Sequence, residues 1–227
     1  DETADLDLAA RCIIQGAAYD NNLLCIAEKE VFVVDSVFDA MMDAMARAGA
    51  VRLRAAEVDR LTNAALQVVG EGADKHHAPR KELLGQDAIK LAEAAGRRVD
   101  PNVELVYGET SFDHPFVQTE QMMPFVPFVR CPSFQKAVEC AQQAEHGYRH
   151  TSIIHSRNVR NMTIMARAMD TTLFVKNGPC MAALGLGGEG YLSFSIAGPT
   201  GEGVTTPLTF TRERRCSLID DLFILGR

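Results

Sequence analysis

The stretch EVFVVDSVFDAMMDAMARAG, residues 30–49, joins two patterns that together predict a fold class. Residues 30–34 are rich in β-branched side chains and predict a strand. Asp35 and Ser36 follow as helix caps, and the apolar residues after them predict a helix that runs to about Gly49. A strand followed at once by a helix is the repeating unit of an α/β fold with a largely parallel sheet.

The same alternation continues on both sides of this stretch, and it supports the same fold class. Residues 4–16 predict a helix, and residues 17–27 predict a polar loop that leads into an apolar segment. Further predicted strands cover residues 51–53, 104–108, 151–156, 171–177 and 208–219, and further predicted helices cover residues 55–69, 86–95, 133–144 and 157–169. Residues 70–85 are expected to form a loop. Residues 122–130 contain two prolines and predict an extended segment or the beginning of a strand.

Composition excludes several classes of function. The 227 residues are 47% hydrophobic and 23% charged, with a net charge of -7, which is ordinary for a globular protein. There is no basic stripe, so we expect no nucleic-acid partner, and the apolar runs fall short of the ~20 residues that span a bilayer. The six cysteines form no CxxC pair, so we expect no zinc site.

The beginning of the chain and its cysteine usage suggest a context. No secretory leader is recognisable, and we expect a reducing, cytoplasmic compartment. The sequence opens with DETADLDLAA, without an initiator methionine. The apolar stripe of this first predicted helix needs a surface to pack on, so we interpret the chain as a segment of a longer protein.

Cys25 is the first candidate for chemistry. A reactive thiol has to be reachable and easily ionised, which favours loops over cores. Cys25 follows the polar loop Asp20-Asn21-Asn22, whose amides could help to bind an oxyanion. The alternative is a structural cysteine buried among Leu23, Leu24 and Ile26, and on local sequence alone that alternative is the more frequent case.

Other candidates carry weaker signals. Glu120 precedes the proline-containing segment and could bind a sugar hydroxyl or act as a base, although a solvated loop carboxylate is the simpler interpretation. His146, His150 and His155 lack the spacing of a helical zinc motif, so we expect no metal there. The glycine-rich residues 185–188 partly match a dinucleotide fingerprint, but turns or wide loops explain them, and the region 198–203, better.

The order of these signals is more specific than any one of them. The stretches DETADLDLAA, GAAYDNNLLCIAEKEVFVVDS, TEQMMPFVPFVR, EHGYRHTSIIHSRNVRNM, DTTLFVKNGPCMAALGLGGEGYLSFSIAGPTGEG and TFTRERRC follow one another along nearly the whole chain. Together they resemble the CoA-acylating aldehyde dehydrogenases, the propionaldehyde and acetaldehyde enzymes of bacterial microcompartments. Leu24 stands where proline is expected, which affects the rigidity of the loop more than its chemistry.

The resemblance implies roles for five residues. Cys25 would be the nucleophile, and Asn22 and the Cys25 amide would lie near the substrate oxygen. Glu120 would hold the ribose of the nicotinamide cofactor, with Met122 and Pro124 facing that cofactor. The reaction would convert a short-chain aldehyde to acyl-CoA through a cysteine thioester, with NAD as cofactor, coenzyme A as co-substrate and no metal.

The resemblance also implies an organisation. It predicts the thiol-bearing catalytic domain of the family, an α/β fold with a largely parallel sheet and helices on both faces. Residues 1–22 would be a remnant of the crossover from the cofactor domain, residues 23–211 the catalytic domain, and residues 212–227 a C-terminal strand and tail. A homo-oligomer is expected, with microcompartment shell or cargo proteins as further partners and the cytoplasm or the microcompartment as location.

Two other functions stay open from the sequence. The first is a thiol hydrolase that uses Cys25 and one of the histidines. The second is a non-catalytic assembly unit, in which the predicted strand at residues 208–219 pairs across a subunit interface. Neither the aldehyde chain length nor the choice between NAD and NADP is encoded in a recognisable motif.

Overall fold

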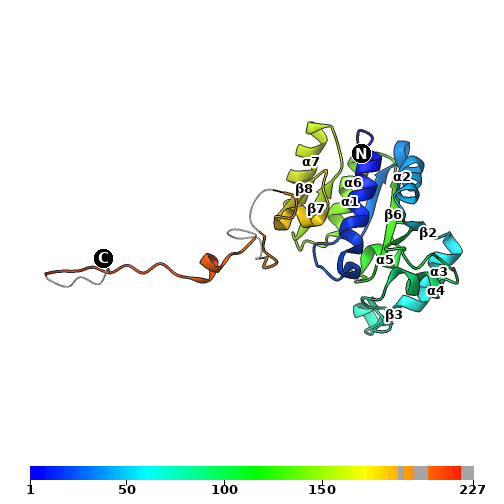
Figure 1. The fold of residues 1–227 in the computed structure, drawn as a ribbon, viewed down its shortest axis with the longest axis horizontal. Helices are drawn as coiled ribbons and strands as arrows, with labels where there is room; N and C mark the ends of the chain where they lie inside the picture. Colours follow the sequence, from blue (N-terminus) through cyan, green and yellow to red (C-terminus); the bar gives the residue numbers. More distant parts are fainter. Residues whose placement is uncertain (189–191, 197–203, 221–227) are drawn as a thin grey trace.

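The computed structural model describes residues 1–188, 192–196 and 204–220, and Figure 1 shows its arrangement. The α-helices are α1 (Leu6–Ala18), α2 (Asp35–Arg47), α3 (Ala55–Ala65), α4 (Ala88–Ala94), α5 (Pro115–Gln118), α6 (Phe134–Ala144) and α7 (Val159–Met169). The strands are β1 (Val31–Val34), β2 (Val51–Arg52), β3 (Leu66–Val69), β4 (His76–Pro79), β5 (Val106–Thr110), β6 (Phe125–Cys131), β7 (Thr151–Ile154) and β8 (Leu173–Lys176). Among the described residues, no helix has the length and apolar character needed to cross a membrane.

A four-stranded sheet forms the centre of the body. Its strand order is β1-β6-β5-β2, and all neighbouring strands are parallel. Successive side chains of β6 point to opposite faces, so Val126 and Phe128 pack with α1 and α2. Phe125 and Val129 pack with α3, α4, α5 and α6 on the other face. The predicted parallel sheet with helices on both faces is confirmed.

A second parallel pair, β7 with β8, lies beside the main sheet (Figure 1). Helix α6 packs on β1 and also contacts α7, which follows β7 in the chain. The edge strand of the main sheet, β1, and the edge strand of the smaller sheet, β7, therefore face each other across a space. That space is the candidate site described below.

The sequence prediction for residues 55–85 was wrong in its second half. Helix α3 ends at Ala65, and the predicted last turn of the helix is instead strand β3. It pairs antiparallel with β4, inside the segment that was predicted to be a loop. The glycines at 70 and 72 have left-handed φ angles of 80° and 59°, which allow the chain to reverse, and the β-branched Val68 and Val69 favour the extended form.

The prediction of a long strand at residues 208–219 was also wrong. Pro207–Phe210 form a short 3-10 helix, η4, and residues 211–219 have no regular structure. Figure 1 shows this segment extending away from the body, and Phe210 and Ile219 are 75% and 85% exposed. A strand is stable only when its backbone groups pair with a neighbour, and within the described residues this segment has no such neighbour.

The proline-containing segment became the central strand β6. Proline removes one backbone donor and is usually found at sheet edges, which is why an extended segment or a strand entry was expected. Pro127 nevertheless lies inside β6, in register with Gly108 of β5. The strand is held by apolar contacts on both faces, because five of its seven residues from Phe125 onward are buried in succession.

Tyr107 links the sheet to helix α2. Its side chain is fully buried, its hydroxyl donates to the Met42 carbonyl oxygen at 2.6 Å, and its ring meets Phe128 edge-on. Tyr107→Phe should lower the free energy of unfolding by about 1 kcal/mol, because one buried hydrogen bond is lost while the ring packing stays. Urea unfolding checks this, and Tyr148→Phe, at a side chain that is 79% exposed, should leave the midpoint unchanged.

Candidate functional site

The Asp20-Asn21-Asn22 turn places Cys25 at the surface. Helix α1 ends at Ala18, and the three residues of the turn have left-handed φ angles of 49°, 50° and 66°. Asn and Asp tolerate this conformation better than other non-glycine residues, which accounts for their succession here. Cys25 is exposed, whereas Cys12, Cys131, Cys140 and Cys180 are buried; the alternative of Cys25 as a buried structural cysteine is therefore wrong.

Asn22 holds the turn together from inside. It is fully buried, and its Nδ2 donates to the carbonyl oxygens of Ala17 and Glu28, both at 3.0 Å. A side-chain amide has two donor hydrogens, so both are used within the loop. A direct contact between Asn22 and a substrate oxygen stays a prediction, and it would require one of these two bonds to open.

Lys29 is a site residue that the sequence analysis missed. Its ammonium group donates to Asn22 O and Asn22 Oδ1, both at 2.8 Å. It also pairs with Glu120 Oε1 at 3.3 Å. Burial lowers the pKa of Lys29, and the negative charges of Glu120, Cys25 and Glu30 oppose that effect. Lys29 therefore connects the loop that carries Cys25 to the predicted cofactor carboxylate.

The three predicted cofactor residues lie in different surroundings. Glu120 is half-exposed beside Lys29, so its carboxylate can accept hydrogen bonds from a ligand. Met122 has a left-handed φ of 50°, and its carbonyl oxygen accepts from Gly85 N at 3.0 Å; the Gly85 carbonyl in turn accepts from Asn21. Pro124 is buried just before β6. Contacts of these three residues with a cofactor stay predictions.

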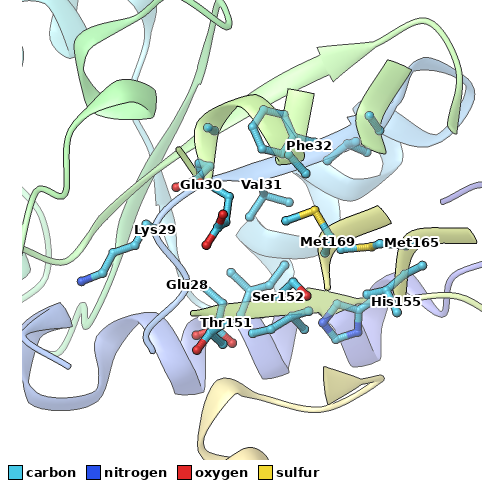
Figure 2. Close-up of a pocket in the computed structure, with 18 of the residues that line it drawn as sticks. Glu28, Lys29, Glu30, Val31, Phe32, Thr151, Ser152, His155, Met165 and Met169 are labelled. Atoms are coloured by element: carbon cyan, nitrogen blue, oxygen red, sulfur yellow. The ribbon is translucent and has the colours of Figure 1, made fainter. Parts of the chain in front are cut away.

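A cavity of about 630 Å³ lies between the edges of β1 and β7. Cys25, Lys29 and Glu120 line it, whereas Asn22, Met122 and Pro124 are not among its lining residues. Figure 2 shows the Glu30 carboxylate pointing into this space and the side chains of Phe32, Met165 and Met169 at an apolar end. The structure thus brings the predicted nucleophile and the predicted cofactor carboxylate to one cavity.

Two carboxyl groups follow Cys25 closely: Glu28 is buried, and Glu30 is half-buried at the cavity wall. Burial raises the pKa of Glu28 to about 7, and burial likewise raises the pKa of Glu30 to about 7. Glu28 Oε1 accepts from the Cys180 backbone N–H at 3.0 Å, while Oε2 has no hydrogen-bond partner among the described residues. A methyl group at Gly16 would overlap Glu28 Oε2, so glycine makes room for this carboxyl.

Three histidines line the far side of the same cavity. His146, His150 and His155 all contribute to its lining. Burial lowers the pKa of His155 to about 4, so it is neutral at physiological pH. Within the described residues, no three potential ligand side chains come together as a metal site.

The glycine-rich segment forms a turn where the structure describes it. Gly185 and Gly187 have left-handed φ angles of 87° and 77°, and a methyl group at Gly188 would overlap the Ala182 carbonyl oxygen. This agrees with the interpretation as turns and wide loops rather than as a dinucleotide fingerprint. Residues 189–191 and 197–203 lie outside the described residues.

Comparisons with known proteins place this site in a family. The sequence model described as the aldehyde dehydrogenase family matches residues 1–191. The chain belongs to the aldehyde dehydrogenase family. Among aldehyde dehydrogenases, it is 47% identical over 220 residues to the acetylating acetaldehyde dehydrogenase EutE of Salmonella typhimurium, covering 97% of this chain and 47% of that protein.

Solved aldehyde dehydrogenase structures show the same fold. Rhodopseudomonas palustris propionaldehyde dehydrogenase, with bound CoA and an acylated cysteine, is 41% identical and superposes with a TM-score of 0.87, over 96% of this chain and 48% of that one. A propionaldehyde dehydrogenase from the fucose utilisation bacterial microcompartment of Clostridium phytofermentans is also 41% identical, with a TM-score of 0.87, over 99% of this chain and 50% of that one. The chain thus spans about half the length of the relatives that it matches.

Proposed function

We propose that this chain is the thiol-bearing catalytic part of a CoA-acylating aldehyde dehydrogenase. One observation carries the proposal: Cys25 is exposed at a cavity that Glu120 also lines, and Lys29 joins the two through the Asn22 turn. The similarity to an acetylating acetaldehyde dehydrogenase, and to a propionaldehyde dehydrogenase solved with CoA and an acylated cysteine, supports the same conclusion.

The reaction follows from a thiolate beside an apolar cavity. The Cys25 thiolate attacks the carbonyl carbon of a short-chain aldehyde and forms a thiohemiacetal. NAD supplies the acceptor for the hydride that leaves this carbon, and a thioester on Cys25 results. The CoA thiol then attacks the thioester and expels the Cys25 thiolate. The sum is aldehyde, NAD⁺ and CoA giving acyl-CoA, NADH and a proton.

The chain's own residues prepare this chemistry. The Cys25 amide is the candidate donor to the oxygen that becomes charged during both attacks. Glu120 fits a ribose because it is half-exposed and a carboxylate accepts two hydroxyl donors. The apolar end of the cavity, with Phe32 and Met169, offers space for a short acyl chain and limits water near it.

The partners and the location belong to the same proposal. We infer a homo-oligomer whose monomers act on a small aldehyde, located in the cytoplasm within a bacterial microcompartment. The microcompartment origin of the Clostridium phytofermentans relative supports this location. A cysteine hydrolase finds no comparable support, because no histidine donates to or accepts from Cys25 in the described part of the chain.

Trapping the acyl group tests the proposal directly. A protein that contains this chain together with its nucleotide-binding half should gain one propionyl group when it is given propionaldehyde and NAD without CoA. Peptide mapping should place that group on Cys25, and adding CoA should release it as propionyl-CoA. An acyl group on another cysteine, or none on any, would overturn the assignment; Cys216→Ala, at an exposed cysteine in the C-terminal segment, should behave like the parent.

A further inference from the structure

The Lys29 ammonium group is held by the loop that carries Cys25 and by Glu120. It donates hydrogen bonds to Asn22 O and Asn22 Oδ1, and it forms an ion pair with Glu120 Oε1. Its side chain is only 14% exposed. A lysine on a loop surface keeps its ammonium group in water, so this one is held in place by its contacts.

The backbone of Lys29 is fixed by the neighbour of Glu120. Gln121 is fully buried and donates through Nε2 to Lys29 O at 2.7 Å and to Phe125 O at 2.9 Å. Phe125 is the first residue of β6. Residues 120 and 121 therefore hold both the side chain and the main chain of Lys29, and they tie it to the central strand of the sheet.

The charges around Lys29 all have one sign. Its positive charge acts on Glu28 and Cys180, and Glu120, Cys25 and Glu30 each raise its pKa when they are negatively charged. Glu120 is on the loop before β6, while Cys25 and Glu30 are on the same segment as Lys29. An ammonium group that is largely shielded from water stabilises most strongly the negative charge that lies closest to it and has the fewest other positive or hydrogen-bonding partners.

We propose that Lys29 is a positioning residue that fixes the Cys25 loop and shares its positive charge between Glu120 and the Cys25 thiolate. The Glu120 part rests on the proposed function. When a ribose engages the Glu120 carboxylate, its hold on Lys29 weakens and more of the ammonium charge acts on Cys25. Occupation of the cofactor site and reactivity of the thiol are coupled in this way through one side chain.

Alkylation of Cys25 in the 227-residue chain, without cofactor, tests this inference. The rate of iodoacetamide labelling at each cysteine is followed by peptide mapping across a range of pH. Lys29→Met should label Cys25 about tenfold more slowly near neutral pH and move its pH profile upward, because the cavity that Cys25 and Lys29 both line loses an ammonium charge. Lys29→Arg should restore most of the rate, and Glu120→Gln should raise it a few fold above the parent.

The outcomes separate the two proposals. If the parent chain shows no selective labelling of Cys25, the proposed function loses its nucleophile. If the parent labels selectively and Lys29→Met labels at the same rate with the same pH profile, Lys29 has no such role and this inference is overturned alone. If Cys12 and Cys140, which are buried in the parent chain, become labelled in Lys29→Met, that variant has lost its fold. The test then rests on Lys29→Arg and Glu120→Gln. If the pH profile of Cys25 labelling is unchanged in both of these variants, the inference is overturned.

Discussion

A Cys25→Ala variant should form NADH from aldehyde, NAD and CoA at least about 10⁴-fold more slowly than the parent protein. The reason is that the acyl group loses its covalent carrier, so neither the thiohemiacetal nor the thioester can form. Binding of the cofactor should survive, because Glu120 and its contacts with Lys29 stay in place. The measurement is NADH absorbance in a protein that contains this chain and its nucleotide-binding half.

A second cysteine variant makes this result specific. Cys216 is exposed like Cys25, but it lies in the segment after η4, which extends away from the body. Cys216→Ala should retain the parent rate. NADH formation by Cys25→Ala at a rate close to that of the parent would show that the thiol is not the nucleophile, and the CoA-acylating assignment would then have to be given up.

Periodicity was sufficient to predict the main fold. The β-branched run at residues 30–34 and the amphipathic helix after it are visible in the sequence because each element buries one recognisable pattern. The β3–β4 hairpin was missed because Leu66–Val69 continue the helical pattern of α3, and only pairing with His76–Pro79 decides between the two forms. The strand expected at residues 208–219 failed for the opposite reason: its pattern is strand-like, but it has no partner among the described residues.

The candidate site was only partly predictable. The polar turn before Cys25 made it a candidate, and that turn requires residues that tolerate left-handed φ angles. The family resemblance, rather than the local sequence, favoured it over a structural cysteine. Glu28 could not be found, because its partner is distant in the sequence: the Glu28–Cys180 bond spans 152 positions. Lys29 bonds to Asn22 only 7 positions away, but its pairing with Glu120 depends on the tertiary fold. The one sequence signal for Glu28 was its position as an acidic residue just after the apolar residues that follow Cys25. A carboxyl group in such a place is either exposed to solvent or buried with a hydrogen-bond partner.

The Glu28 contribution to the free energy of unfolding should fall by roughly 3 kcal/mol as the pH rises from about 5 to about 8, and the difference between the parent and a Glu28 variant measures it. Burial raises the pKa of Glu28 from its ordinary value of 4.5 to about 7. Between these two values the folded chain holds a proton that the unfolded chain has released, so each increase in pH favours unfolding. Below about pH 4.5 both states are protonated and the effect disappears.

Glu28→Gln should remove the Glu28 contribution to this pH dependence, leave the contributions of Glu30 and His155, and keep the packing in place. The amide oxygen can still accept from the Cys180 N–H, and the neutral side chain fits the space over Gly16. Urea unfolding at several pH values should show the variant more stable than the parent near pH 8 and close to it near pH 5. Glu82→Gln, at an exposed loop residue, should follow the parent at every pH.

A destabilising carboxyl thus lies three residues after Cys25, the proposed nucleophile. Glu28 ties the Cys25 loop to the Cys180 segment, and Asn22 donates to its carbonyl oxygen, so this residue takes part in placing the thiol. Functional sites commonly retain groups that lower stability. If Glu28→Gln instead loses stability equally at every pH, the carboxylate is compensated in the folded chain, and its burial carries no penalty.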